Sequence, residues 1–148
     1  MIEFIDHPLV QGYIRANKFG TLLGMDFNIT APGEILYKMP VTEQHLATPI
    51  AAHGGAISAL MDATMGVCAL SQVLPDNRVV STVEMKISFI APSLLGDELS
   101  ATASIVKTGK RLLFVEGKIK NQKDELIAFA TGTFNSYPAE KAGFNNRI

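Results

Sequence analysis

The chain has 148 residues, of which 47% are apolar and 18% charged, and its formal net charge at pH 7 is -1. This length suits a single domain over 1–148, and this composition supports a hydrophobic core and argues against a disordered chain. Acidic and basic residues are scattered, so we expect no nucleic-acid partner. Cys68 is the single cysteine, which excludes an internal disulfide and is typical of a small buried hydrophobe.

The alternation of apolar and polar residues changes along the chain, and each change marks a predicted element. The first twenty residues lack a basic segment followed by an apolar run, so we predict no signal peptide. The first half predicts an N-terminal helical segment over 1–19, with a helix over 7–18 that ends at Gly20, strands over 21–29 and 34–41 joined by the turn TAPG, and a helix from 53 to 74. The second half predicts strands over 79–90, 98–108, 111–121 and 126–137, and a loose polar tail over 138–148.

The helix predicted over 53–74 is apolar on almost every side, and Asp62 is the only fixed charge between Glu43 and Asp76. A membrane-spanning helix needs about 20 strongly apolar residues, and a carboxylate at the middle of a bilayer is costly. This segment also contains small and polar residues, so we predict a buried helix in a cytoplasmic protein that does not enter a membrane. A lone buried carboxylate often takes part in chemistry.

The strands after this helix predict the architecture. In 79–90 the side chains alternate, with one face formed by Val83, Met85, Ile87 and Phe89 and the other by Glu84, Lys86 and Ser88. Consecutive strands with short turns indicate an antiparallel sheet, so we predict an α+β fold in which a curved antiparallel sheet wraps around a long central helix. One sheet cannot cover that helix on all sides, so we expect a homodimer at least, with a dimer of dimers as the larger assembly.

The stretch HGGAISALMD places His53, Gly54 and Gly55 at the start of the predicted helix and Asp62 nine residues after the histidine. This pattern resembles the hotdog fold and, more closely, the PaaI-like acyl-CoA thioesterases of the phenylacetate pathway. The segments VSTVEMKISFIAPSLLGDEL, VKTGKRLLFVEGKI and LIAFATGTF are similar to the strands that follow the helix in that family. The resemblance covers about residues 20–136. It implies a thioester hydrolase that takes acyl-CoA with a short, medium or aryl acyl group as its substrate and uses no other cofactor.

Thioester hydrolysis needs a group that polarises the carbonyl and a group that activates water. The Gly54 and Gly55 amides are suited to the first task, because N–H groups at a helix N-terminus lack partners and no Cβ blocks a ligand. Asp62 lies about 12 Å further along the helix, so it should not serve Gly54 of its own chain. The resemblance implies that Asp62 faces the HGG turn of a second copy, as general base or as nucleophile. The alternatives are an Asp62 satisfied by backbone or hydroxyl groups, and glycines that only relieve crowding.

Residues around this pattern have a functional and a structural interpretation. The resemblance places Thr82 beside the acid, where it would hold a water, although an ordinary strand threonine needs no function. His53 would orient the turn or donate to the thioester, or it caps the helix. Relatives commonly carry Asn six residues before the histidine, where this chain has Ala47, and Gln44 and His45 lie nearby as candidates for that role.

The substrate should contact two further regions. Coenzyme A carries phosphates, and the family makes nucleotide contacts near the hairpin that here contains Lys107, Lys110 and Arg111. Lysines are also common at hairpin tips, so both interpretations stay open. We expect the acyl group in an apolar tunnel between the two central helices, lined by Leu60, Met61, Met65 and residues of 79–90. No metal-binding or dinucleotide motif stands in a suitable context, so we expect no metal site.

Two other functions are compatible with the sequence. The first is a hotdog dehydratase or hydratase, which typically pairs a histidine with an acid in another arrangement, and water addition to an enoyl-CoA would identify it. The second is a non-catalytic acyl-CoA binding protein, which Ala47 leaves open. Tight binding without turnover would identify that function.

Overall fold

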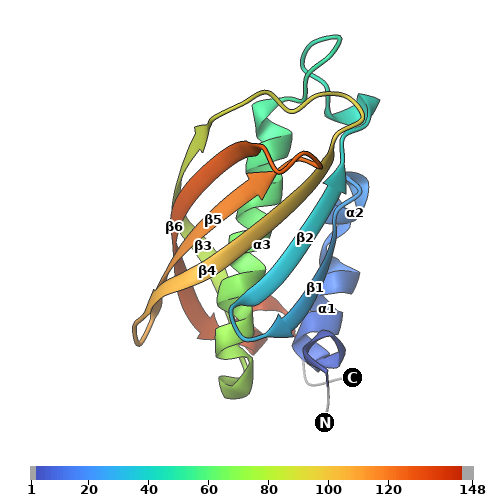
Figure 1. Ribbon diagram of the computed structural model, residues 1–148. Coiled ribbons are helices and arrows are strands. Elements are labelled where there is room, and N and C mark those ends of the chain that lie inside the picture. Colours follow the sequence, from blue (N-terminus) through green and yellow to red (C-terminus); the bar gives the residue numbers. More distant parts are fainter. Residues whose placement is uncertain (1–2, 145–148) are drawn as a thin grey trace.

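The computed structural model describes residues 3–144, in which a six-stranded antiparallel sheet curves around one long helix, α3 (Gly54–Val73) (Figure 1). The strands lie in the order β1-β2-β4-β5-β6-β3, so β1 and β3 are the edges. The other elements are η1 (Phe4–Asp6), α1 (Pro8–Ala16), α2 (Lys18–Leu22), β1 (Asp26–Ala31), β2 (Glu34–Pro40), η2 (Glu43–His45), η3 (Leu74–Asp76), β3 (Arg78–Phe89), β4 (Glu98–Thr108), β5 (Leu112–Lys120), β6 (Leu126–Pro138) and η4 (Ala139–Ala142). This arrangement confirms the predicted α+β fold.

The N-terminal segment forms two helices instead of the single helix predicted over 7–18. The side chain of Asn17, between α1 and α2, accepts a 3.0 Å hydrogen bond from the Gly20 N–H and so caps the second helix. Because this cap starts a new helix at Lys18, the helix continues through Gly20. The prediction that Gly20 ends the helical segment is therefore wrong, and the first strand begins only at Asp26.

The TAPG turn joins β1 and β2 as predicted, with Gly33 in the left-handed region at φ +79°. A side chain at this position would strain the backbone. Ser71 of α3 is fully buried, and its Oγ accepts a 2.8 Å hydrogen bond from the Gly33 N–H while donating to the Cys68 carbonyl. These contacts attach the hairpin to the C-terminal half of α3.

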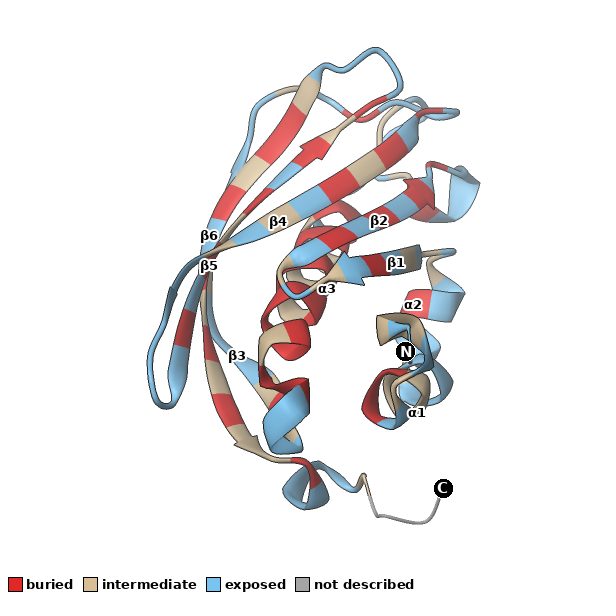
Figure 2. Ribbon diagram, turned by 60° about the horizontal axis from the view of Figure 1, so that its bottom comes forward, coloured by how far each residue is buried: buried red, intermediate tan, exposed pale blue. Residues whose placement is uncertain are grey.

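α3 packs one side against the concave face of the sheet, and most of its residues are buried (Figure 2). The side chains that pack there with no exposed surface include Leu60, Met61, Met65, Cys68 and Ala69. Two strand glycines make room for the methionines, because a Cβ on Gly117 would lie 2.7 Å from Met61 Sδ and one on Gly132 would lie 3.1 Å from Met65 Cε. The Gly54–Asp76 segment is long and apolar enough to cross a membrane, but 67% of its apolar window is buried within the protein.

β3 changes the direction of its side chains at Val83. From Glu84 onward the predicted alternation holds, with Met85 and Ile87 partly buried and packed on the core. The pairing with β6 shifts register between Thr82 and Glu84, so Val83 is the extra residue of a β-bulge. The predicted alternation, which placed Val83 on one face with Met85, Ile87 and Phe89, is therefore interrupted at Val83, whose side chain is 58% exposed. The bulge instead turns Thr82 toward α3.

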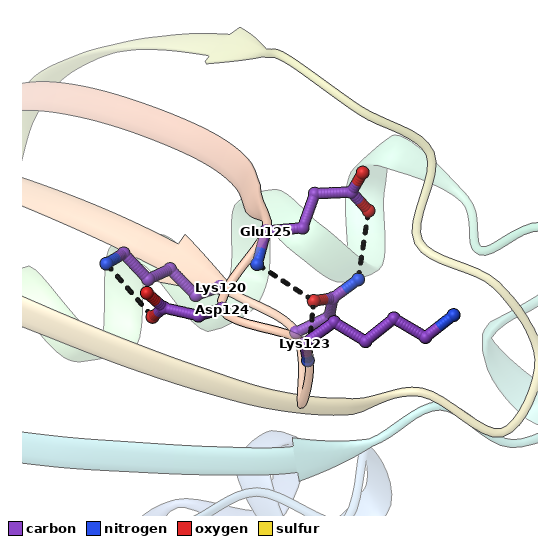
Figure 3. A network of polar contacts seen from close by, with 5 residues as sticks. Lys120, Lys123, Asp124 and Glu125 are labelled. Carbon is purple, nitrogen blue, oxygen red and sulfur yellow. Dashed lines mark hydrogen bonds and ion pairs between the residues drawn. The ribbon is translucent and has the colours of Figure 1, made fainter.

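Figure 3 shows the turn between β5 and β6, with Lys120, Lys123, Asp124 and Glu125 labelled. Asn121 closes this turn. Its Oδ1 accepts hydrogen bonds from the N–H groups of Lys123 and Glu125, and its Nδ2 donates to Glu125 Oε1. Lys120 and Asp124 form a 3.1 Å ion pair across the turn, and Asp124 takes the left-handed conformation at φ 61°. One buried asparagine therefore satisfies the backbone donors that this turn leaves free.

The C-terminal segment predicted as loose over 138–148 is described as far as Phe144. In that part η4 follows β6 directly, and Phe144 lies against α1. A Cβ on Gly12 of α1 would be 3.0 Å from Phe144 Cδ1, so the aromatic ring uses the space that this glycine leaves. Residues 145–148 lie outside the described part of the chain.

Candidate active site

Asp62 lies in the middle of α3, partly buried, and contacts the start of β3. Its Oδ1 accepts a 2.7 Å hydrogen bond from Thr82 Oγ1. Within residues 3–144 the Asp62 carboxylate has no other hydrogen bond and no ion pair. Its second oxygen therefore keeps its capacity to accept a proton or a hydrogen bond from a ligand.

A cavity of about 190 Å³ opens beside Asp62 and Thr82. It lies between α1, α3, the start of β3 and the end of β6, and its lining is mainly apolar and aromatic. α1 contributes Tyr13, α3 contributes Gly66, and the C-terminal segment contributes Phe144. The carboxylate thus borders an apolar space inside a single chain.

Tyr13 connects this cavity to the N-terminal strands. Its hydroxyl lies 3.3 Å from the Tyr37 hydroxyl and accepts a 3.1 Å hydrogen bond from Asn17 Nδ2. Burial raises the pKa of Tyr13, the hydrogen bond with Tyr37 opposes that shift, and the negative charge of Asp62 adds to it. Burial also raises the pKa of Tyr37. Both phenols are therefore neutral at physiological pH, and the negative charge of Asp62 acts on Tyr13 in the wall of the cavity.

Gly54 and Gly55, at the start of α3, differ in whether their N–H groups have a hydrogen-bond partner. His53 caps the helix, because its Nδ1 accepts a 2.7 Å hydrogen bond from the Gly55 N–H. The Gly54 N–H has no partner within residues 3–144. The ring of Phe89 lies next to Gly54, because a Cβ placed on Gly54 would lie 3.3 Å from Phe89 Cζ. Of the two amides, Gly54 is the one that is available to a ligand.

The loop that leads to this turn is fixed by His45. This side chain is buried, and its Nδ1 accepts from the Thr42 N–H while its Nε2 lies 2.7 Å from the Leu23 carbonyl. The His45 carbonyl in turn accepts a 2.7 Å hydrogen bond from the His53 N–H. Both ring nitrogens are engaged, so His45 cannot offer its side chain in place of the asparagine that Ala47 replaces. Ala47 itself is exposed on this loop.

Asp62 and Gly54 do not meet within one chain. They lie eight residues apart on the same helix, which corresponds to about 12 Å along its axis. Between them, small residues that are not fully buried form the face of α3 that the sheet leaves open, namely Gly55, Ser58 and Ala59. Asp62 and the Gly54 amide of one chain are therefore too far apart to contact the same carbonyl group.

The three cationic residues of the β4–β5 hairpin are all exposed: Lys107, Lys110 and Arg111. This hairpin is connected to the site through the sheet, because Leu112 of β5 pairs with Asn135 of β6, which pairs with Ser81 of β3. Two strand spacings, about 10 Å, separate Leu112 from Ser81. Along the direction of the strands, the hairpin therefore lies at the same position in the sheet as Ser81, the residue before Thr82.

The acyl tunnel predicted along Leu60, Met61 and Met65 is wrong for these three residues. Each has no exposed surface and packs between α3 and the sheet, where a second chain cannot reach it. Val79 to Thr82, which belong to the predicted strand over 79–90, line the cavity beside Asp62, and their part in binding an acyl group stays a prediction.

Sequence reasoning missed the N-terminal and C-terminal walls of this cavity. The amphipathic pattern of 7–18 does place Leu9 and Tyr13 on one helix face, and both line the cavity. The sequence pattern does not indicate what this helix face packs against, however, because Gly66 and Phe144, which line the same cavity, are more than fifty residues away. The nucleus of the site, Asp62 with Thr82, was found from the HGG pattern.

Comparisons with known proteins identify the family to which this chain is similar. A family model described as the thioesterase superfamily matches residues 51–128. Human acyl-coenzyme A thioesterase 13 is 28% identical over 117 residues, which cover 77% of this chain and 81% of that protein. Acyl-coenzyme A thioesterase PaaI of Escherichia coli (strain K12) is 30% identical over 110 residues, which cover 74% of this chain and 76% of that protein.

Solved structures show the same fold. The E. coli PaaI protein from the phenylacetic acid degradation operon superposes with a TM-score of 0.79 and 25% identity, over 86% of this chain and 89% of that chain. The smu.793 protein of Streptococcus mutans UA159, solved bound to acetyl CoA, superposes with a TM-score of 0.70 and 24% identity, over 77% of this chain and 89% of that chain.

Proposed function

This chain belongs to the thioesterase superfamily and is a thioester hydrolase with the hotdog fold, and we propose that it cleaves acyl-CoA at a site that two chains complete. Relatives named as acyl-coenzyme A thioesterases support this substrate class. A structural neighbour solved with acetyl CoA supports it as well. The observation that carries the proposal is the Asp62 carboxylate, which is held by Thr82 and leaves one oxygen free beside an apolar cavity.

In this proposal Asp62 activates the attack on the thioester carbonyl. As general base, it takes a proton from water while the water oxygen bonds to the carbonyl carbon, and the proton passes to the CoA sulfur as the C–S bond breaks. As nucleophile, its oxygen would bond to the carbonyl carbon while the C–S bond breaks and CoA leaves as a thiolate that takes a proton from solvent. Water would then cleave the resulting anhydride, which releases the acyl group as a carboxylic acid and restores Asp62. Thr82 acts by donating to one carboxylate oxygen, which directs the other toward the substrate.

Gly54 polarises the carbonyl in this proposal. Its N–H is the helix-terminal donor without a partner, and the helix N-terminus carries about half a positive charge that favours a developing oxyanion. Gly55 and His53 have a supporting role, since the His53 ring binds the Gly55 N–H and fixes the turn. His53 Nε2 remains available to donate to the substrate.

The second chain is part of the proposal because one chain separates its own donor and carboxylate by about 12 Å. Two features support pairing through this face. The open side of α3 carries small residues that allow a second helix to approach, and β3 is an edge strand with an exposed Val83. An unpaired strand edge is a ready site for pairing with another chain. We place the homodimer there and keep a dimer of dimers as its larger form.

Lys107, Lys110 and Arg111 supply the cations for the phosphates of coenzyme A in this proposal, since they are exposed on the level of Ser81. Coenzyme A enters only as part of the substrate, and the reaction uses no metal and no further cofactor. Within residues 3–144, the Gly54–Asp76 segment is the one helix apolar enough to cross a membrane, and 67% of its apolar window is buried in the protein, which supports a protein that does not span a membrane. The cytoplasm is the location that we propose.

Replacement of Asp62 by asparagine tests the proposal. We expect Asp62→Asn to lower kcat for acyl-CoA by at least about 100-fold, which is typical for loss of a general base. Glu84→Gln is the matched control, because Glu84 lies exposed on the outer face of the same strand that carries Thr82. Thiol release from acyl-CoA measures both variants. Equal rates for wild type and Asp62→Asn would remove Asp62 from the mechanism, and binding without turnover in wild type would indicate an acyl-CoA binding protein.

A further inference from the structure

We infer that the cavity beside Asp62 receives the acyl group within a single chain, and that α1 and the C-terminal segment make it selective for compact apolar acyl groups. The inference rests on the proposed function, because it places the thioester at Asp62. It replaces the tunnel between two helices with a pocket that belongs to one chain. Part of the pocket lining lies outside the segment that matches the family model, residues 51–128, namely Leu9, Tyr13, Phe134, Tyr137 and Phe144.

The cavity has a polar end and an apolar end. Along α3 its wall runs from Asp62 to Leu70, which spans about 12 Å. Along β3, which returns in the opposite direction, it runs from Thr82 back to Val79, which spans about 10 Å. Both walls place the carboxylate and the threonine at one end. An acyl chain whose carbonyl lies at Asp62 therefore points toward Leu70 and Val79.

The size of the cavity favours a compact group. Its volume is about 190 Å³, whereas an apolar cavity of about 150 Å³ is large enough to hold benzene. The ring of Phe134 and the rings of Tyr13 and Tyr137 line it, and aromatic walls suit either an aryl group or a short aliphatic chain. A group as large as a phenylacetyl or octanoyl chain fits this space, and a long fatty acyl chain exceeds it.

One wall of the pocket is formed by residues that come together only in the folded chain. Leu9 of α1 is almost fully buried and lines the cavity. Phe144 lies against Gly12, also of α1, with only 3.0 Å between Phe144 Cδ1 and a Cβ placed on that glycine. The hydroxyl contact between Tyr13 and Tyr37 anchors α1 to the sheet. α1 therefore acts as a fixed wall and limits the size of the pocket.

Gly66 sets the width of the pocket. It lies one helical turn beyond Asp62 on α3 and leaves open space where other residues place a Cβ. A Cβ there would lie 3.6 Å from Phe134 Cε1, which is an ordinary contact, so alanine fits without strain. Alanine also favours a helix over glycine by about 1 kcal/mol. Gly66→Ala therefore narrows the pocket in a protein that stays folded.

The test compares kcat/KM for acetyl-, phenylacetyl-, octanoyl- and palmitoyl-CoA in three variants. Gly66→Ala should lower the phenylacetyl-to-acetyl and octanoyl-to-acetyl ratios about tenfold, which is the usual effect of one methyl group in an apolar pocket. Leu9→Ala should raise the palmitoyl-to-octanoyl ratio by a similar factor, because it removes part of the wall formed by α1. Ile14→Ala is the matched control, since Ile14 is exposed on the same helix. Unchanged acyl preference in both Gly66→Ala and Leu9→Ala would overturn the inference.

A binding measurement separates this inference from the proposed function. The dissociation constant of a non-hydrolysable octanoyl-CoA thioether is measured by calorimetry for Asp62→Asn and for Asp62→Asn with Gly66→Ala. A weaker complex for the double variant supports the pocket even if Asp62→Asn hydrolyses acyl-CoA at the wild-type rate. Equal affinities overturn the pocket even if Asp62→Asn is inactive.

Discussion

Thr82 Oγ1 donates to Asp62 Oδ1 over 2.7 Å, and this contact joins an edge strand to the central helix. In a strand with unbroken alternation, Thr82 would share the outer face with Glu84. The bulge at Val83 reverses that face and turns the hydroxyl toward α3. The bulge thus gives the carboxylate a partner that holds it in one orientation.

Removal of this hydroxyl should slow the reaction. Thr82→Val keeps the shape of the side chain but leaves Asp62 without its donor, and a hydrogen bond to a charged group contributes about 1.5–3 kcal/mol. We expect kcat for acyl-CoA to fall about tenfold or more, with Thr82→Ser retaining most of the activity. Equal kcat values for the valine and serine variants would show that the contact has no role in turnover.

Gly54 offers a substitution that removes only the N–H group. Gly54 is the first residue of α3, where proline is well tolerated because that N–H has no helical partner. Gly54→Pro should therefore keep the fold and lower kcat by about 100-fold or more, as expected for loss of one oxyanion donor. Gly54→Ala is its matched control, because alanine keeps the N–H and meets only the exposed ring of Phe89. A proline variant as active as the alanine variant would exclude this donor.

The His53 cap should be visible in stability. His53 Nδ1 accepts from the Gly55 N–H, so His53→Ala leaves that donor unpaired and should lower the free energy of unfolding by about 1 kcal/mol. Asparagine is also a good N-cap residue, so His53→Asn should recover most of the loss. Urea unfolding monitored by circular dichroism measures both variants. Identical midpoints for wild type and His53→Ala would contradict the cap.

The Cys68 thiol should be unreactive in the folded protein. Burial raises its pKa from 9.0 to about 12, so almost no thiolate forms at pH 8. Iodoacetamide should modify the native chain far more slowly than the chain in urea, with Cys68→Ala as the blank. Modification at equal rates in the two states would contradict the burial.

The raised pKa of Cys68 also predicts how the stability of the protein changes with pH. Above pH 9 the unfolded thiol loses its proton while the folded thiol keeps it, so unfolding becomes more favourable as the pH rises toward 12. Between pH 9 and 10, wild type should lose stability more steeply than Cys68→Ala, because both proteins carry the same tyrosines and differ only in the thiol. Parallel curves for the two proteins would show that Cys68 does not contribute to this dependence.

Local patterns were sufficient to predict the long helix and the second to sixth strands, whereas the placement of Thr82 beside Asp62 came from the resemblance to the hotdog family. The helix over 53–74 and the strand over 98–108 were predicted to within one or two residues, because neither segment contains a competing turn signal. The prediction that the N-terminal helix ends at Gly20 was wrong for a local reason, because the Asn17 side chain caps a second helix that begins before Gly20.

The remaining features depend on contacts between distant segments. The bulge at Val83 arises from the pairing of β3 with β6, which no alternation within 79–90 reveals. The choice between Gly54 and Gly55 as free donor depends on the direction of the His53 ring. The end of the pocket depends on Phe144 meeting Gly12 across the whole length of the chain. Each of these is a tertiary contact that a single sequence does not specify.

The central claim is that Asp62 of one chain works with Gly54 of another, and mixed dimers test it most directly. Asp62→Asn and Gly54→Pro chains carrying different tags are co-expressed, and the mixed dimer is isolated by two affinity steps. Each variant alone should be nearly inactive. In the mixed dimer one site receives both changes and the other receives neither, so we expect about half of the wild-type activity to return. A mixed dimer as inactive as its two parents would contradict a site shared between chains.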